Sequence, residues 1–341
     1  MRKILSQKII PIIFFTGMIL TSIGCDIKRE AIGADDEIMV ITDNASKEAI
    51  TIALSSIFND TIYTPKPESK YKLKYVDPVG YNGIKEINNV IIGSIGNNEL
   101  NPSTKLVMTL LGEDRYLKSL QGKDQVVFTF DQFAKNQVFM ILSANSVDDL
   151  MSSLDGKREW IKEQFDEKMK QRQRKFLFKS ARHKKEEKAL ADKYPWSIKI
   201  PWGWEVIKDS VEAHFVWLGR EMPYQWITIH GENGIIATDS TEAANYAISF
   251  PSKYFEHIQT NPYKFKAELT EFNQWNAWRY TGVWESKEDA KGGPFASYLF
   301  YDGQTDKSYY IFTLLHFPQK RKNLYMRQLD VIASSFAIQE K

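Results

Sequence analysis

A proline-free stretch rich in charged side chains covers residues 146–193 and constrains the fold of this chain more than any other feature. Ser146 with Asp149 three residues later is typical of a capping box at the start of a helix. Ten Lys or Arg stand against two acids from Lys168 to Lys188, after an acidic first part, and this polarity suits the helix dipole. We therefore predict one long charged helix over 146–193, with Gly156 as a weak point at which it can kink or restart.

The apolar stripe on this helix is thin, because it consists only of Trp160, Phe165, Met169 and Phe176. Two interpretations fit such a composition. Either the basic part is an arm that touches anionic lipid or another polymer, or the helix is a solvated bridge between two domains. The length of 341 residues exceeds that of one average domain, so we favour the bridge.

The segments on either side of the helix predict two domains. Residues 37–145 alternate short apolar runs with segments of helical spacing, which indicates a small α+β unit. Residues 194–341 contain several runs typical of antiparallel strands, and the run from Tyr309 to Leu315 is apolar on both faces, as in a central strand covered on both sides. The predicted fold class is α+β, two domains joined by a long charged helix. In the C-terminal domain we expect an antiparallel sheet flanked by helices, as in an α/β/α sandwich.

The N-terminus carries the pattern of a bacterial export signal. Residues 1–24 begin with a positive region, and the last sixteen of them are uncharged, fewer than the ~20 residues of a spanning helix. The run ends in Ser22-Ile23-Gly24-Cys25, which resembles a lipobox, with Ser22 where Leu is usual. Cys25 is the only cysteine, and we predict cleavage before it and attachment of lipid to its sulfur. The polar residues 25–36 are predicted to be a tether between the lipid and the fold.

Cleavage at this point would leave 317 residues with 42 basic and 43 acidic side chains, a formal charge of −1. Such a balance gives no reason to expect nucleic acid as a partner. The expected partners are the membrane, through the N-terminal lipid, and an unidentified protein or glycan of the envelope. The predicted location is the cell envelope, with the outer membrane favoured over the inner. Asp26 beside Cys25 would retain a lipoprotein in the inner membrane by enteric sorting, whereas acidic residues at this point are linked to surface export in other phyla. The segment Asp26 to Glu30 is ambiguous between these, and the periplasmic and the surface side both stay open.

Catalytic motifs are missing from the sequence. There is no G-x-x-x-x-G-K-[ST] phosphate loop, no G-x-S-x-G elbow and no H-E-x-x-H, and the five histidines show no metal spacing. A single cysteine excludes a disulfide framework and a Cys-based zinc site. We therefore assign no catalytic residue, metal ligand or cofactor, and we interpret His316, which lies in an apolar run, as a structural histidine. Whether the chain is an enzyme stays open, with a non-enzyme favoured.

Eight of the nine tryptophans lie from Trp196 onward. Core packing of a wide sheet accounts for most of them, although Trp faces also stack on sugars and anchor peptides. The candidate ligand surface consists of Trp202, Trp204, Trp217 and Trp284. Three carboxylates near it in sequence are of the kind a glycoside hydrolase uses, namely Glu268, Glu271 and Glu285, but their spacing gives this interpretation no support.

Several pieces of the C-terminal half together resemble a known family. They are Ile198 to Trp204, Phe215 to Arg220, Trp284, Gly292-Gly293-Pro294-Phe295 and Lys322 to Leu329. The pattern is similar to a family of bacterial lipoproteins catalogued as domain of unknown function 4837, over nearly the whole chain after Cys25. The resemblance implies a cell-envelope location in Bacteroidota-type bacteria and brings no activity and no catalytic residues.

A weaker likeness concerns only Ile200-Pro201-Trp202-Gly203-Trp204. This piece is similar to the opening strand of Mog1/PsbP-type α/β/α sandwiches, which are mostly binding or assembly modules. Taken together, the sequence predicts a lipid-anchored cell-envelope protein that acts as a binding or scaffolding module. An extracytoplasmic hydrolase, or a glycan or small-molecule binder that uses the Trp-rich domain, is the alternative.

Overall fold

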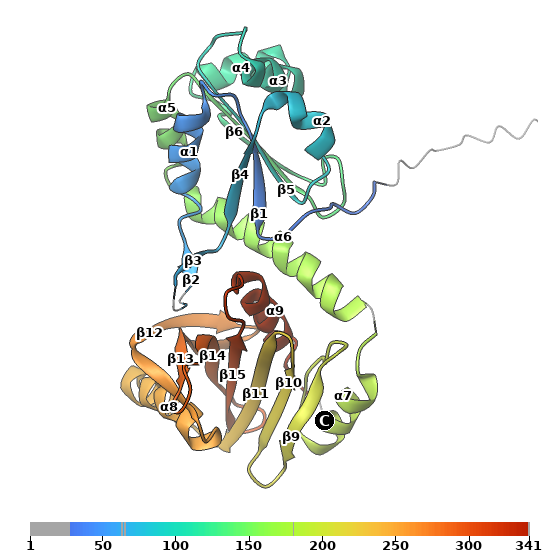
Figure 1. Cartoon of the computed structure of the whole chain (residues 1–341), viewed down its shortest axis with the longest axis vertical. Coiled ribbons are helices and arrows are strands. Elements are labelled where there is room, and N and C mark those ends of the chain that lie inside the picture. Colours follow the sequence, from blue (N-terminus) through green and yellow to red (C-terminus); the bar gives the residue numbers. More distant parts are fainter. Residues whose placement is uncertain (1–27, 63, 65, 180, 340–341) are drawn as a thin grey trace, which may run out of the picture.

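The computed structural model of the chain describes residues 28–62, 64, 66–179 and 181–339. The export signal and the predicted lipid attachment at Cys25 lie outside the described residues. Two domains stack along the long axis of the molecule, and helix α6 (Arg158–Lys179) runs between them (Figure 1). The predicted division into two α+β domains is confirmed.

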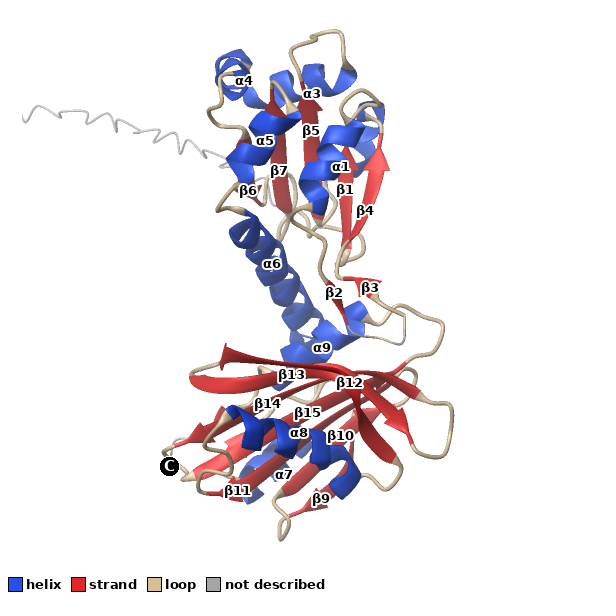
Figure 2. Cartoon of the chain, turned by 90° about the vertical axis from the view of Figure 1, so that its left-hand side faces the viewer, coloured by secondary structure: helices blue, strands red, loops and turns tan. Residues whose placement is uncertain are grey.

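The N-terminal domain is a five-stranded sheet with helices on both faces (Figure 2). Its strands follow the order β4 (Lys72–Val76), β1 (Glu37–Ile41), β5 (Asn89–Ile95), β7 (Val138–Ala144) and β6 (Val126–Phe130). The first four strands are parallel and β6 is antiparallel to β7. Parallel strands need covered faces, which is why β5 and β7 are apolar along nearly their whole length.

Helices α1 (Lys47–Ser55), α5 (Val147–Leu154) and the first half of α6 cover one face of this sheet. The other face is covered by α2 (Tyr81–Ile84), α3 (Pro102–Leu111) and α4 (Glu113–Leu120), with a short 3-10 turn, η1 (Pro78–Gly80), before α2. A small hairpin of β2 (Thr61–Ile62) and β3 (Glu68–Ser69) extends from the domain.

The C-terminal domain is a seven-stranded antiparallel sheet between helices, which confirms the predicted sandwich. The strand order is β12 (Ile258–Phe272), β13 (Trp275–Ser286), β14 (Gly292–Asp302), β15 (Lys307–His316), β11 (Tyr224–Asn233), β10 (Phe215–Arg220) and β9 (Glu205–Ser210). One face carries α8 (Ser240–Tyr254); the other carries α7 (Lys184–Lys193), α9 (Asn323–Ala333) and the pair β8 (Trp196–Ser197) and β16 (Ala337–Ile338). Strand β15 lies at the centre with both faces buried, as its sequence predicts.

The segment predicted as one long helix over 146–193 forms α5, α6 and α7; the prediction allows for the restart at Gly156 but not for the break after α6. The first break falls at Gly156, whose φ of +71° lies in the left-handed region that glycine adopts readily. The second break follows α6, where Arg182 pairs with Pro201 and the His183 amide donates to the Ile200 carbonyl at 3.0 Å. A tertiary contact with the C-terminal domain therefore ends the helix. The predicted helix start is confirmed, since Ser146 caps α5 and its Oγ accepts from the Asp149 backbone amide at 3.2 Å.

Helix α6 is embedded in both hydrophobic cores. Ile161, Phe165 and Met169 belong to the N-terminal core, and Leu177 belongs to the C-terminal core. The predicted stripe is thus half wrong, because Trp160 and Phe176 are exposed and their neighbours Ile161 and Leu177 are buried instead. The spacing of four between Ile161, Phe165 and Met169 is the one that keeps side chains on a single helix face. A helix with a face in each core connects the domains rigidly.

The tether predicted over residues 25–36 is shorter in the structure. Glu30 pairs with Lys135 and Ile32 with Ile87, so the chain is part of the N-terminal domain from residue 30 onward. Asp35 is bound by Arg172 of α6 in a buried ion pair. Polar residues in this segment therefore serve as partners for buried groups, which composition alone does not distinguish from a solvated linker.

Candidate functional site

The four tryptophans predicted to form a ligand surface do not lie together. Trp202 is 72% exposed in the loop before β9, whereas Trp204 is only 2% exposed and sits in the core on the face that carries α7 and α9. Trp284 is 5% exposed, and Trp217 is half-buried; both belong to the opposite face of the sheet, under α8. Only Trp217 contributes to a surface that a ligand could reach in company with other aromatic side chains.

Trp284 has a structural role that also explains the Gly-Gly-Pro-Phe piece. Its indole Nε1 donates to the Leu315 carbonyl at 3.1 Å. That carbonyl lies so close to Gly293 that a Cβ there would meet the oxygen at 2.0 Å. Glycine is therefore required at position 293 of β14, beside the hydrogen bond from Trp284 of β13 to Leu315 of β15. His316 has one hydrogen-bond partner, since its Nδ1 lies 3.1 Å from the Gly292 carbonyl.

An aromatic ledge lies on the α8 face at the β9 edge of the sheet, and we define it by Ile207, Trp217, Tyr224 and Trp226. The ring centroids of Trp217 and Trp226 are 4.5 Å apart at an interplanar angle of 69°, an edge-to-face arrangement. Ile207 is 45% exposed and Tyr224 42% exposed. The ledge is apolar, half-buried and continuous with the edge strand β9, which pairs with β10 alone among the described strands.

Gly219 provides the floor of this ledge. A Cβ at this position would lie 2.5 Å from Ile207 Cδ1 and 2.8 Å from Trp226 Cδ1. The missing side chain therefore lets both residues lie directly on the backbone of β10. Trp226, which the sequence interpretation did not select, pairs in register with Gly219 across β10 and β11. The sequence shows that Trp226 lies in a run typical of a β-strand. Only the strand register shows that it lies opposite Gly219.

A second polar cluster joins α8 to the sheet through His230. Its Nδ1 lies 2.8 Å from the hydroxyl of Tyr246, and its Nε2 lies 2.7 Å from the hydroxyl of Tyr254. Because Tyr246 donates its own proton to Glu232 at 3.3 Å, its oxygen accepts from the Nδ1–H and Nε2 accepts from Tyr254. The hydrogen bonds thus run in one direction, from Tyr254 through the imidazole to Glu232.

Burial lowers the pKa of His230 to about 4, with Lys253 and His214 acting in the same direction. The imidazole is therefore neutral in the folded protein at neutral pH, and each ring nitrogen already has a partner. Such a histidine fixes α8 to β11. It has no free nitrogen with which to accept a proton from a substrate.

The carboxylates considered for a glycoside hydrolase are far apart. Glu268 pairs in register with Arg279, whereas Glu285 pairs with Gln259. Six residues of strand separate Arg279 from Glu285, which is about 20 Å, beyond the ~5–9.5 Å that glycosidases use. Glu271 is three residues from Glu268 on the same strand and so points to the opposite face. Burial raises the pKa of Glu268, but Lys266 and Arg279 outweigh it and hold the pKa below its usual range.

Metal binding and membrane crossing find no support in the described part of the chain. There, no three His, Cys, Asp or Glu side chains cluster as metal ligands would. Of the helices that the structure describes, none combines the length and the apolar character needed to cross a bilayer.

The molecule is thus a two-domain α+β protein whose C-terminal sandwich carries an aromatic ledge at one sheet edge. Residues 182–335 match the family described as "Domain of unknown function (DUF4837)", which confirms the predicted resemblance for the C-terminal half. The expectation that this likeness extends over nearly the whole chain is wrong, because residues 31–177 match a second family, "Domain of unknown function (DUF8532)". Curated proteins yield no match to this chain.

Solved structures that match include Mog1. The Ran-binding protein Mog1p of Saccharomyces cerevisiae is 11% identical, over 42% of this chain and 90% of that one, with a TM-score of 0.32. LpqN of Mycobacterium tuberculosis, involved in cell envelope biogenesis, is 14% identical over 42% of this chain and 83% of that one, with a TM-score of 0.29. A structure from Bacteroides thetaiotaomicron is 11% identical over 43% of this chain and 46% of that one, with a TM-score of 0.27.

Proposed function

We propose that this chain is a lipid-anchored protein of the bacterial cell envelope that binds an extended segment of a protein partner. The lipobox-like Ser22-Ile23-Gly24-Cys25 supports the anchor. The exposed side chain of Lys28, three residues beyond the cysteine, is compatible with an anchor at that point. Thioether-linked diacylglycerol anchors stably because every buried methylene contributes ~0.8 kcal/mol.

The aromatic ledge beside the β9 edge carries the binding part of this proposal. An edge strand offers unpaired backbone N–H and C=O groups to a further strand, and an adjacent apolar surface takes the alternate side chains of that strand. Ile207 comes from β9 itself, so a segment added to β9 would place its side chains beside Ile207 and Trp217.

The ledge favours a protein segment over a sugar. Sugar rings stack on flat indole faces, whereas Trp217 and Trp226 stand edge to face at 69° and present no common plane.

The outer membrane is the proposed site of the anchor.

A photo-crosslinking amino acid at position 207 or 224, in cells that express the full chain, tests the binding proposal. We expect both positions to give the same discrete adduct, and Gly219→Ala to remove the adduct from position 224. Leu269 is the matched control, because it is 63% exposed and lies on the other edge strand, β12. Equal adducts from 207, 224 and 269, or none from the ledge, would contradict a partner at β9.

A further inference from the structure

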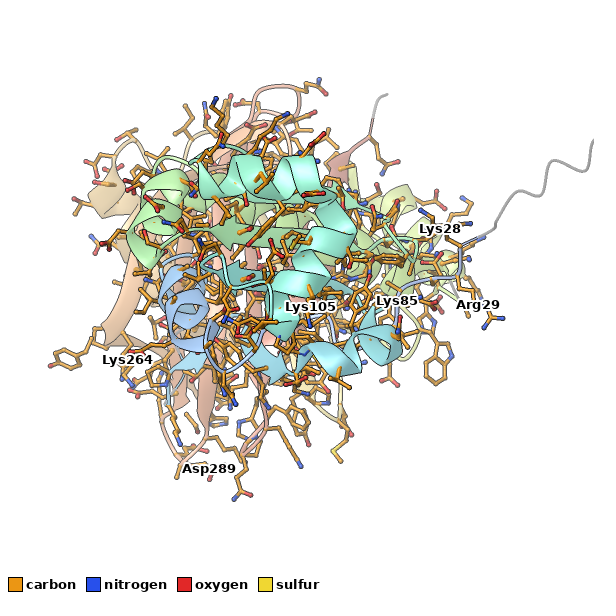
Figure 3. All side chains as sticks on the ribbon, turned by 90° about the horizontal axis from the view of Figure 1, so that it is seen from above. Lys28, Arg29, Lys85, Lys105, Lys264 and Asp289 are labelled. Carbon is orange, nitrogen blue, oxygen red and sulfur yellow. The ribbon has the colours of Figure 1, made fainter. Side chains whose placement is uncertain are left out.

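One side of the N-terminal domain gathers basic side chains around the start of the described chain. The Lys135 amide donates to the Arg29 carbonyl at 2.8 Å, and Lys28 Nζ donates to the Asp131 carbonyl. Figure 3 shows Lys28 and Arg29 together on this side, with Lys264 on the opposite side of the molecule.

The end of α6 completes this surface. Lys175 pairs with Glu30, and Lys175, Phe176 and Lys179 line a groove of about 700 Å³ together with Glu30 and Ala31. We call this surface the anchor-side face and define it by these basic side chains and the aromatic beside them: Lys28, Arg29, Lys135, Lys168, Lys175, Phe176 and Lys179.

The charge of the anchor-side face is positive even when its acids are counted. Its six cations face three acidic side chains, namely Glu30, Glu86 and Asp131. Glu30 is paired with Lys175, and Asp131 lies 3.7 Å from Lys168. Arg172 and Asp35 also border the groove but neutralise each other in their buried ion pair. A net positive face results on a chain whose overall charge is close to neutral.

Exposed aromatic side chains accompany these lysines. Phe176 is 68% exposed in the groove, Phe130 is 43% exposed under Lys168, and Trp160 is 46% exposed beside Phe128. Clusters of large aromatic side chains are uncommon on protein surfaces that face only water. The membrane interface, in contrast, favours Trp and Phe flanked by Lys or Arg.

The length of chain before the described residues places this face at the membrane. Only three residues lead from Cys25 to Lys28, and three residues span at most ~10 Å. The screening length at physiological salt is ~8 Å, so charges this close to lipid headgroups are felt. A tether of the predicted length, up to residue 36, would have removed this constraint.

We propose that the anchor-side face lies on the membrane and binds anionic lipid headgroups, so that the protein is held by its acyl anchor and by a basic, aromatic surface together. This inference deepens the proposed function, because the lipid on Cys25 is what brings the face to the bilayer. The occupant is the lipid surface itself, and the ledge at the β9 edge stays available for its partner.

A weak artificial anchor makes the contribution of the face measurable. The chain from Cys25 onward is purified, and its only thiol is capped with a maleimide that carries one myristoyl chain, which alone gives marginal binding. Partitioning is then measured on phosphatidylcholine vesicles with and without phosphatidylglycerol. Each basic residue near an anionic surface strengthens binding several-fold, so we expect at least about a tenfold preference for phosphatidylglycerol, which added NaCl abolishes.

Charge-reversal variants show whether this face is responsible. The variant Lys28→Glu, Arg29→Glu, Lys179→Glu changes three exposed side chains and is expected to lose the preference at unchanged circular dichroism. Its matched control is Lys105→Glu, Lys118→Glu, Lys123→Glu, which has the same net charge on exposed positions of α3, α4 and the turn after α4. The control should retain the preference.

Equal loss in both variants would overturn the proposal, as would a wild-type chain without any preference for phosphatidylglycerol. The chemical anchor works whether or not cells attach lipid to Cys25, so this result is separate from the test of lipidation. It is also separate from the crosslinking test of the ledge, which reports on the other domain.

Discussion

Arg327 of α9 donates a hydrogen bond to Asp166 of α6 over 2.6 Å, and this contact joins the C-terminal domain to the helix that fills the N-terminal core. The same carboxylate oxygen accepts from Tyr71 Oη at 2.7 Å, and the guanidinium lies 4.9 Å from the Tyr71 ring centroid. Gln328, the next residue, donates to Gln173 of α6 at 2.9 Å. A polar network therefore seals the domain boundary.

We expect this network to make the two domains unfold together. In urea, the wild-type transition followed by far-UV circular dichroism should coincide with that followed by Trp fluorescence, which reports mainly on the C-terminal domain because eight of nine tryptophans lie there. Arg327→Ala leaves Asp166 partly buried without its cation and should cost about 3 kcal/mol. The two transitions should then separate. Coincident transitions in the variant would contradict a role of Arg327 in coupling.

The buried His230 predicts a loss of stability in acid. Its pKa is about 4 in the folded protein and near 6.5 when unfolded, so the unfolded chain binds the extra proton between these values. The contribution of His230 to the free energy of unfolding should therefore be fully present above about pH 6.5. The free energy of unfolding should fall by about 3 kcal/mol as the pH drops toward 4. His230→Gln keeps hydrogen-bonding groups but does not titrate. Denaturation at pH 7 and pH 4.5 should show a smaller difference for this variant; an equal difference would rule out His230 as the cause.

Gly219→Ala should distort the aromatic ledge. The new Cβ collides with Ile207 and Trp226, and overpacking of this kind costs about 1–3 kcal/mol. Gly83→Ala serves as control, because a Cβ there meets nothing within 4 Å and alanine suits a helix better than glycine. Thermal unfolding should show a lower midpoint for Gly219→Ala and an equal or higher one for Gly83→Ala. Equal midpoints for both variants would mean that the ledge is loosely packed.

Asp35 holds the first described segment against α6. It binds Arg172 and accepts a hydrogen bond from the side-chain amide of Gln173. Arg172 also donates to the backbone carbonyl of Asn136 at 2.9 Å. Asp35→Ala leaves Arg172 buried without an anion, which should cost about 3–5 kcal/mol and release residues 30–36. Backbone amide exchange of this segment should then accelerate relative to the exposed control Glu163→Ala. Unchanged exchange would mean that the two bridges to Lys135 and Ile87 suffice to hold it.

Periodicity and turn residues were enough to predict most of the fold. Both domains, the central strand around Ile311 and the helix start at Ser146 follow from local patterns that the structure retains. The break after α6 could not be predicted in this way. It depends on Arg182 meeting Pro201, a contact that forms only once the C-terminal sheet is in place.

The candidate site was harder to predict for the same physical reason. Trp204 and Trp217 are both aromatic side chains next to apolar runs, but only the assembled sheet places Trp204 in the core on one face and Trp217 half-buried on the other. Asp35 and Arg172 are separated by 137 residues, so their ion pair leaves no local signal. Composition therefore suggested a long tether where the structure has a packed segment.

The central claim is that lipid on Cys25 brings this protein to the membrane, and metabolic labelling with a clickable palmitate tests it most directly. The full chain, expressed in a Bacteroidota-type bacterium, should take up the label and fractionate with membranes. Cys25→Ala should take up none, because it removes the only thiol of the chain. A wild-type chain without label, or a Cys25→Ala variant that is still labelled, would contradict the account.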